Sequence, residues 1–230
     1  MTDYGFDEFA SIDLAENPDP RCPVILVLDA SSSMDQVLPG QTQSSLSALN
    51  SGLDVLVSEL HQDPLAKRRV EVSFVTYGSE ITPATPFATV ENLVLPSLVP
   101  SGVTSTGQAL EVALDALEAR KKEYKANGVE YYRPWLMLIT DGLATDDLSG
   151  AIERITTAEA SKKLSMFAIG VEGADMDQLA KLTPSRAPVK LQGVKFGELF
   201  AWLSASQSAV SASQPGDKVA LPAPSGWAEV

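Results

Sequence analysis

The sequence contains only one cysteine and is short of basic residues. A lone thiol, Cys22, cannot form an internal disulfide. The 230 residues include 17 Lys and Arg against 30 Asp and Glu, which gives a net charge of −13. A chain with this charge repels a phosphate backbone, so we do not expect nucleic acid as a partner.

The sequence also has no apolar run of 18 residues, which excludes a membrane-spanning helix of ordinary length. Its first residues, MTDYGFDEF, contain neither a basic segment nor an apolar segment of the kind found in secretory signals. We therefore expect a cytoplasmic protein that does not bind membranes. Hydrophobic residues make up 44% of the chain, enough to fill the core of a globular domain.

Composition divides the chain into three parts. Residues 1–21 contain six acids and two prolines but no sustained apolar period, which predicts a flexible acidic arm. Residues 205–230 are rich in Ser, Ala and Pro, which predicts a disordered tail. Residues 22–204 remain as a single domain of ordinary size.

Within this domain, short apolar runs alternate with segments of helical period. This alternation predicts an α/β fold with a doubly wound, mostly parallel central sheet and helices on both faces. Two prolines in segment 81–90 restrict it to an irregular or antiparallel edge strand. The predicted helix over 110–117 ends in a basic cluster, Arg120 to Lys125, which suits the negative end of its dipole. The main predicted strands are 23–29, 70–78, 135–141 and 164–171.

Polar residues that directly follow apolar strands are the candidates for a functional site. In a parallel sheet all strands end at one edge, where the connecting loops gather. The strand PVILVLD leads into Asp29, Ser31 and Ser33, and the strand WLMLIT leads into Asp141. A third polar loop, SGVTSTG, places Thr104 just before a helix. We therefore expect these five side chains to meet at the carboxyl edge of the sheet.

The five side chains supply only carboxylate and hydroxyl oxygens. Such hard donors select Mg²⁺ or Mn²⁺, with Ca²⁺ as a weaker candidate, over zinc or copper. Since most of the donors are neutral, a bound cation would need a further anionic oxygen from outside the chain. The alternative interpretation is that Asp29 and the serines simply cap the helix that follows them. For Asp146 and Asp147 we expect capping of the helix that contains Ile152.

The three motifs in order, DASSS, SGVTSTG and ITDG, resemble the metal-ion-dependent adhesion site of von Willebrand factor A (VWA) domains. The resemblance covers about residues 22–204. It implies that Asp29, Ser31, Ser33, Thr104 and Asp141 are metal ligands, direct or through water. It also implies a protein partner that supplies a Glu or Asp carboxylate to the metal.

Within this family, two segments are most similar to the bacterial tellurium-resistance-type (TerY-like) VWA proteins. They are HQDPLAKRRVEVSFVTYG and SGVTSTGQALEVALDAL. The similarity implies a role in a cytoplasmic bacterial stress-response system.

Three enzyme classes also place an acid after an apolar strand, and the sequence fits none of them. A haloacid dehalogenase-type phosphatase needs a second Asp where this chain has Ser31. A P-loop NTPase needs a G-x-x-x-x-G-K-[ST] motif, and an α/β-hydrolase needs G-x-S-x-G with a downstream His; both patterns are missing. We therefore predict a non-enzymatic, metal-dependent protein-binding module. The alternative is a metal-dependent phosphoesterase that uses the same oxygen cluster.

Overall fold

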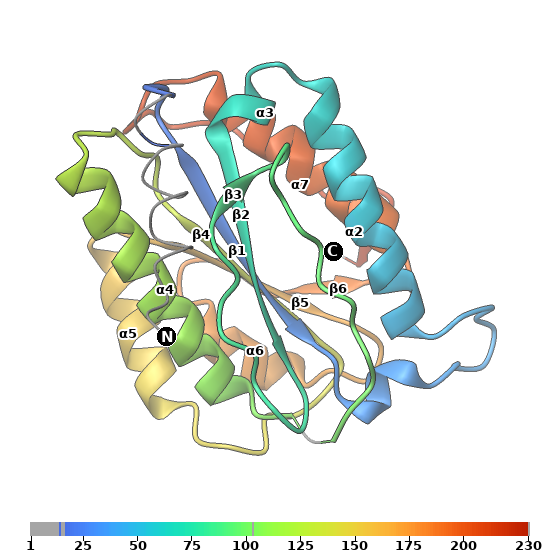
Figure 1. The fold of residues 1–230 in the computed structure, drawn as a ribbon. Coiled ribbons are helices and arrows are strands. Elements are labelled where there is room, and N and C mark those ends of the chain that lie inside the picture. Colours follow the sequence, from blue (N-terminus) through green and yellow to red (C-terminus); the bar gives the residue numbers. More distant parts are fainter. Residues whose placement is uncertain (1–13, 15–16, 103, 230) are drawn as a thin grey trace, which may run out of the picture.

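The computed structural model describes residues 14, 17–102 and 104–229 and shows one mixed sheet with helices on both faces (Figure 1). Among these residues the sheet has seven strands in the order β3-β2-β1-β4-β5-β6-β7. The strands are β1 (Cys22–Asp29), β2 (Val70–Tyr77), β3 (Ala88–Thr89), β4 (Trp135–Thr140), β5 (Ser165–Gly170), β6 (Val189–Leu191) and β7 (Ala228–Glu229). The predicted doubly wound α/β fold is confirmed.

Strand β1 is an interior strand of this sheet, third in the order. It pairs in parallel with β2 on one side and with β4 on the other, and all eight of its residues are buried. A continuous apolar run is the sequence pattern expected for a strand that is covered on both faces. The remaining parallel pairs, β4 with β5 and β5 with β6, extend the sheet in one direction.

The helices form one layer on each face of the sheet. Two long helices, α2 (Ser45–Gln62) and α7 (Phe196–Ser211), pack together on one face, beside the short helix α3 (Ala66–Arg69). The other face carries α4 (Thr106–Ala126), α5 (Ser149–Ala160) and α6 (Met176–Leu182). Alternate residues of β1 point to the two layers, Leu26 toward α2 and Val27 toward α4.

The two edge strands are antiparallel. Strand β3 lies within segment 81–90 and pairs with the beginning of β2 at one edge of the sheet. The prediction of an irregular or antiparallel edge strand in this segment is confirmed. At the opposite edge β7 pairs with β6, which the sequence analysis did not foresee. No helix in the described part of the chain is both long enough and apolar enough to cross a membrane.

The prediction that residues 205–230 are a disordered tail differs from the structure. Helix α7 continues to Ser211, and Trp227 is buried in the core near Trp202. The segment between them is tied down by hydrogen bonds, including Tyr132 Oη to the Ser213 carbonyl at 2.5 Å. A single tryptophan and a short edge pairing thus order a segment whose composition is typical of disorder. The predicted arm falls largely on residues 1–13, 15 and 16, which lie outside the described residues.

A buried ionic cluster joins the start of β1 to β2 and α4. The carboxylate of Glu71 is fully buried and accepts hydrogen bonds from Arg21 Nε at 2.9 Å and from Arg120 Nε at 2.9 Å. Tyr124 Oη donates to the same carboxylate at 2.5 Å. Arg120 therefore serves as a core ion-pair partner, whereas the sequence predicted only a favourable interaction with the helix dipole; α4 in fact continues to Ala126. The ion pair with Glu71 explains why a charged residue can occupy the buried face of α4.

Replacement of Glu71 by Ala tests how much this cluster contributes to stability. Removal of Glu71 takes away the buried carboxylate that both Arg21 and Arg120 contact, and the loss of one partner of a buried ion pair typically costs about 3–5 kcal/mol. We expect Glu71→Ala to lower the free energy of unfolding by this amount in urea denaturation followed by tryptophan fluorescence. The matched control is Glu91→Ala, which removes an exposed carboxylate paired with Lys67 and should change stability little. Equal effects of the two substitutions would contradict the prediction.

Candidate metal centre

Three neighbouring strands end side by side at the carboxyl edge of the sheet. Asp29, the last residue of β1, is in register with Tyr77, the last residue of β2. On the other side Leu28 is in register with Ile139, so Thr140 at the end of β4 lies beside Asp29. The parallel pairing of β1 with both neighbours therefore brings these three side chains to one place.

The carboxylate of Asp29 is fully buried and is held by hydrogen bonds on both oxygens. Oδ1 accepts from the backbone N–H of Ser31 at 2.8 Å, and Oδ2 accepts from the hydroxyl of Thr140 at 2.5 Å. The first bond closes the turn that follows β1, and the second joins β1 to β4. The orientation of this carboxylate is thus set by the strand pairing and by its own turn.

A chain of hydroxyl contacts leads from Asp29 to Asp141. The hydroxyls of Ser31 and Ser33 lie 3.0 Å apart, and Ser33 Oγ donates to Asp141 Oδ1 at 2.8 Å. Ser33 belongs to a short 3-10 helix, η1 (Ser32–Asp35), which turns its side chain toward the loop after β4. Ser31 is buried, whereas Ser33 is exposed, so the site is closed on one side and open on the other.

The fifth predicted ligand, Thr104, lies against the same loop. Its hydroxyl would be 3.2 Å from a Cβ placed on Gly142, and its carbonyl accepts hydrogen bonds from the N–H and the hydroxyl of Thr145 at 2.9 and 3.1 Å. The structure therefore gathers all five predicted residues, four through hydrogen-bonded contacts and Thr104 through its contact with the loop that begins at Asp141.

The loop after β4 also fixes the beginning of α4. Asp146 accepts hydrogen bonds from the N–H groups of Gly107 at 3.0 Å and Gln108 at 2.8 Å. The expectation that Asp146 caps its own helix is therefore wrong, because the N-terminus of α4 lies closer to this carboxylate. Asp147 does cap the following helix, through the N–H of Ser149 at 2.9 Å. A Cβ on Gly107 would lie 2.3 Å from the Asp147 carbonyl, so only glycine permits this approach.

Two residues of the site, Tyr77 and Thr140, were missed by sequence reasoning. Thr140 positions Asp29, and Tyr77 accepts a hydrogen bond from Thr106 Oγ1 at 3.3 Å beneath the site. Both are the last residues of apolar strands. That position was the signal that identified Asp29, and the same criterion applied to every strand end would have identified both of them.

The two carboxylates differ from ordinary surface acids in their ionisation. Burial raises the pKa of Asp29, and the hydrogen bond from Thr140 opposes this effect. Burial, together with the charge of Asp29, raises the pKa of Asp141 to about 6, although the hydrogen bond from Ser33 opposes it. Burial also raises the pKa of Tyr77 well above its usual value, and the charge of Asp29 adds to this rise. A cation between the carboxylates would favour their ionised forms.

The donor set agrees with the chemistry of a hard cation. It consists of two carboxylates and three hydroxyls, and no group of three or more His, Cys, Asp or Glu side chains suited to a metal occurs in the described part of the chain. Hydroxyl-rich sites that leave positions for water suit Mg²⁺ or Mn²⁺ rather than zinc. The residues present therefore fit a divalent cation with oxygen ligands.

Comparison with known proteins identifies the fold family. The family model of the von Willebrand factor type A domain matches residues 24–194 of the sequence. A sequence comparison with curated proteins gave no significant match.

Several solved structures share the fold at low sequence identity. The pilus adhesin SpaC from Lactobacillus rhamnosus GG aligns with a TM-score of 0.65 and 14% identity, over 84% of this chain and 32% of SpaC. The PilB minor pilin from Streptococcus sanguinis aligns with a TM-score of 0.56 and 16% identity, over 83% of this chain and 62% of PilB.

The vWF domain of the type V pili tip protein Mfa5 from Porphyromonas gingivalis aligns with a TM-score of 0.55 and 13% identity, over 87% of this chain and 99% of that domain. The chain thus spans about a third of SpaC and less than two thirds of PilB. The family model covers most of the chain and includes the residues of the site up to Asp141, so the chain belongs to the von Willebrand factor type A domain family.

Proposed function

We propose that the chain is a non-enzymatic protein-binding module whose contacts depend on a divalent cation, Mg²⁺ or Mn²⁺. The ligands in this proposal are the five residues of the candidate centre: Asp29, Ser31, Ser33, Thr104 and Asp141. The observation that supports it is the hydrogen-bonded series from Asp29 through the two serines to Asp141, which brings only oxygen donors to one edge of the sheet.

A cation at this site would have few fixed negative charges around it. Only Asp29 and Asp141 carry charge among the proposed ligands, and Ser33 lies on the open side. A bound cation would therefore attract an anionic oxygen from outside. We propose that a Glu or Asp side chain of a protein partner supplies this oxygen.

Exposed apolar side chains near the site favour a protein partner over a small substrate. Val37 is 59% exposed and follows η1, and Leu143 is 56% exposed and lies two residues after Asp141. Val99, 66% exposed, precedes Ser101, whose N–H donates to the Ala30 carbonyl at 2.8 Å. These three residues are among the four exposed large hydrophobics of the described residues, and apolar side chains around a polar centre are typical of protein-docking surfaces.

The cellular setting in this proposal is a cytoplasmic bacterial stress-response system of the tellurium-resistance type. Support comes from the resemblance of residues 61–78 and 101–117 to TerY-like proteins. The shared fold of pilus adhesins supports a binding role for such a domain but adds nothing about this setting.

Metal binding can be tested by titration of the purified chain with Mn²⁺ in a calorimeter. We expect Asp29→Ala and Asp141→Ala each to weaken Mn²⁺ binding by about tenfold or more, because each removes one of the two charged donors. Asp147→Ala is the matched control, since this exposed carboxylate accepts hydrogen bonds from Ser149 and is not a proposed ligand. Unchanged Mn²⁺ affinity in both ligand variants would contradict the assignment.

Partner binding can be tested with the immobilised chain in extracts of its native host. We expect proteins that are retained in Mg²⁺ to be lost in the presence of a chelator and with Asp29→Ala. Leu143→Ser should weaken retention while it leaves Mn²⁺ affinity unchanged, because this side chain lies beside the site and is not a ligand. Val94→Ser, an exposed valine beyond β3, is the control. Equal retention with and without chelator would contradict a metal-dependent contact.

The phosphoesterase alternative makes a different prediction. Segments 29–36, 101–107 and 140–147 contain no Lys, Arg or His that could act as a base or hold a phosphate. We therefore expect no hydrolysis of p-nitrophenyl phosphate above background in Mg²⁺ or Mn²⁺. Metal-dependent turnover that disappears in Asp29→Ala would establish the enzymatic alternative.

A further inference from the structure

A cavity lies at the amino ends of the strands, at the end of the sheet opposite to the candidate metal centre. It has a volume of about 720 Å³ and opens at the amino ends of β4 and β5, beside Trp135 and Ser165. Part of its wall is the segment from Val210 to Leu221, which Tyr132 ties to the domain. This volume falls in the range of sites for small molecules.

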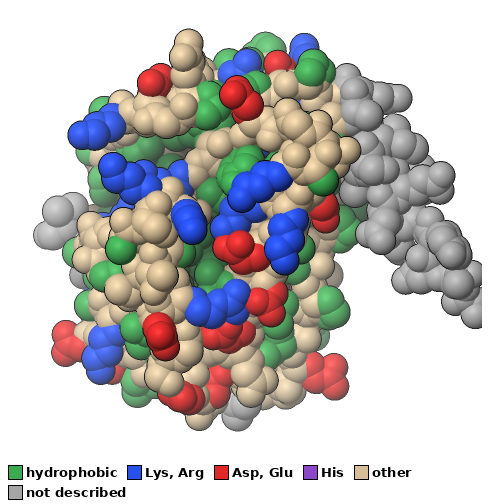
Figure 2. All heavy atoms as spheres, turned by 90° about the vertical axis from the view of Figure 1, so that its left-hand side faces the viewer, with side chains coloured by type: hydrophobic (Ala, Val, Ile, Leu, Met, Phe, Trp, Pro, Cys, Tyr) green, Lys and Arg blue, Asp and Glu red, His purple; other side chains and the backbone are tan. Residues whose placement is uncertain are grey.

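The cavity is lined by seven of the 17 Lys and Arg side chains of an otherwise acidic protein. On the face shown in Figure 2, Lys and Arg side chains gather around a hollow. Two of the seven have carboxylate partners, Lys121 with Glu118 and Arg186 with Glu159. The other five form no ion pair with any residue that the structure describes: Lys125, Arg133, Lys162, Lys163 and Lys218.

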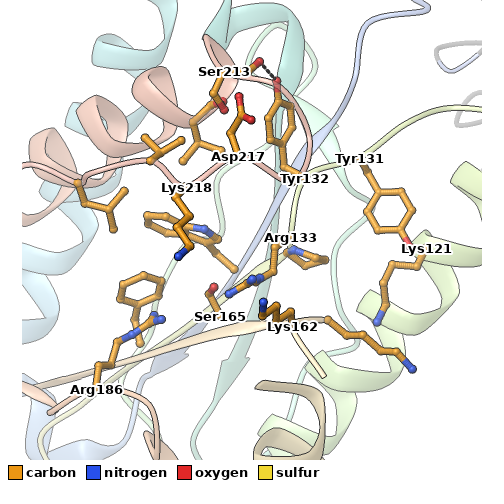
Figure 3. A pocket seen from close by; sticks show the side chains of 18 of the residues that line it. Lys121, Tyr131, Tyr132, Arg133, Lys162, Ser165, Arg186, Ser213, Asp217 and Lys218 are labelled. Carbon is orange, nitrogen blue, oxygen red and sulfur yellow. Dashed lines mark hydrogen bonds between the residues drawn. The ribbon is translucent and has the colours of Figure 1, made fainter. Parts of the chain in front are cut away.

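Several of these cations converge on one point. Figure 3 shows the charged ends of Lys218, Arg133, Lys162 and Arg186 directed toward the space in front of Ser165. These residues come from four separate segments of the chain. Arg186 has Glu159 as a partner, but Lys218, Arg133 and Lys162 form no ion pair with a described residue. Like charges that face one another are unfavourable, so this arrangement is suited to an anion in the space between them.

Arg186 is held at the cavity wall by its own contacts. Its guanidinium lies 4.1 Å from the centre of the Phe167 ring, and Nη1 donates to the Met166 carbonyl at 3.0 Å. Burial lowers the pKa of Arg186, the nearby Arg133 lowers it further, and Glu159 opposes both effects. The Arg186 side chain is thus held at the cavity wall, and the positive charge of Arg133 disfavours its charged form.

The backbone of Lys162 provides an independent observation. Lys162 is the only residue other than glycine with positive φ, at 56°, in the described part of the chain. It follows the C-terminus of α5 in a Schellman motif, in which its N–H donates to the Glu159 carbonyl at 2.9 Å. Glycine is the usual residue at this position because a side chain is unfavourable there. The chain thus carries a lysine at the cavity at a cost in stability.

We propose that this cavity binds a small anion with linked phosphate groups, such as a diphosphate or triphosphate. Several unpaired cations require several negative charges within a short length, which linked phosphates supply. The forked donors of Arg133 and Arg186 match pairs of phosphate oxygens, and the lysines add point charges. The aromatic rings on the wall would contact any organic group attached to the phosphates.

The shape and the charge of the protein favour a small anion over a long one. The cations are confined to a cavity, and the segment from Val210 to Leu221 encloses one side of it. A nucleic acid would extend beyond the cavity onto the surface of a protein with a net charge of −13, which repels it. A compact polyphosphate meets a lining in which seven Lys and Arg side chains outnumber the two acidic ones, Glu118 and Asp217.

Calorimetry with the full chain in a chelating buffer tests this proposal without any contribution from the metal centre. The probes are inorganic tripolyphosphate, ATP, inorganic phosphate and a peptide of six glutamates. We expect tripolyphosphate and ATP to bind at least about tenfold more tightly than inorganic phosphate, since they engage more cations at once. Equal affinity for tripolyphosphate and ATP would show that the phosphates suffice, and tighter binding of ATP would show that the nucleoside also contacts the wall.

Two pairs of substitutions locate the binding. Arg133→Gln with Lys218→Gln removes two unpaired cations of the cavity and should weaken tripolyphosphate binding by about tenfold or more. The matched control, Lys122→Gln with Lys181→Gln, removes two exposed lysines that do not line the cavity and should change affinity less than about twofold.

Lys162→Gly separates a binding role from a structural one. We expect the melting temperature to rise, because glycine tolerates the left-handed backbone, and tripolyphosphate affinity to fall by about threefold or more. The proposal is overturned if tripolyphosphate does not bind at millimolar concentration, if both double variants bind it equally, or if the glutamate peptide binds more tightly. The last result would assign the cavity to an acidic protein segment.

Discussion

The pairing of β1 with β2 on one side and β4 on the other is the constraint on which both ends of the molecule depend. Since all three strands run in the same direction, their carboxyl ends meet, and this places Asp29 between Tyr77 and Thr140. At the other end the same pairing brings Arg21 to the buried Glu71. The candidate metal centre therefore lies at the carboxyl ends of the strands and the basic cavity at their amino ends, roughly 25 Å apart for a strand of this length.

Charge is divided unequally between these two ends. The carboxyl edge carries Asp29 and Asp141 with hydroxyl groups around them, and segments 29–36, 101–107 and 140–147 contain no Lys, Arg or His. The amino edge carries the seven lysines and arginines that line the cavity, five of which form no ion pair with a described residue, together with Glu118 and Asp217. A net charge of −13 describes neither end, because the potential within a recess follows the groups that line it rather than the sum over the chain. Sequence-level charge correctly disfavours long polyanions and says little about a small one.

Sequence reasoning was most successful in predicting which side chains at strand ends lie together. Asp29 and Asp141 are recognisable because each follows an apolar strand, and in a parallel sheet such positions must converge. It failed where a contact joins segments that are distant along the chain. Asp146 caps α4 rather than its own helix, and Arg120 pairs with Glu71 inside the core. Neither partner can be chosen from local spacing, because several helix ends and acids were equally available.

The sequence by itself determined the α/β class, the approximate strands and helices, and the oxygen-only donor set, since periodicity and residue chemistry are local properties. Only the tertiary structure shows that the final segment is ordered and that the basic cavity exists. Residues 212–229 have a composition typical of disorder, yet they are held by the pairing of β7 with β6 and by the burial of Trp227. The cavity unites cations from distant segments, and their convergence is a property of packing in three dimensions, which no linear pattern contains.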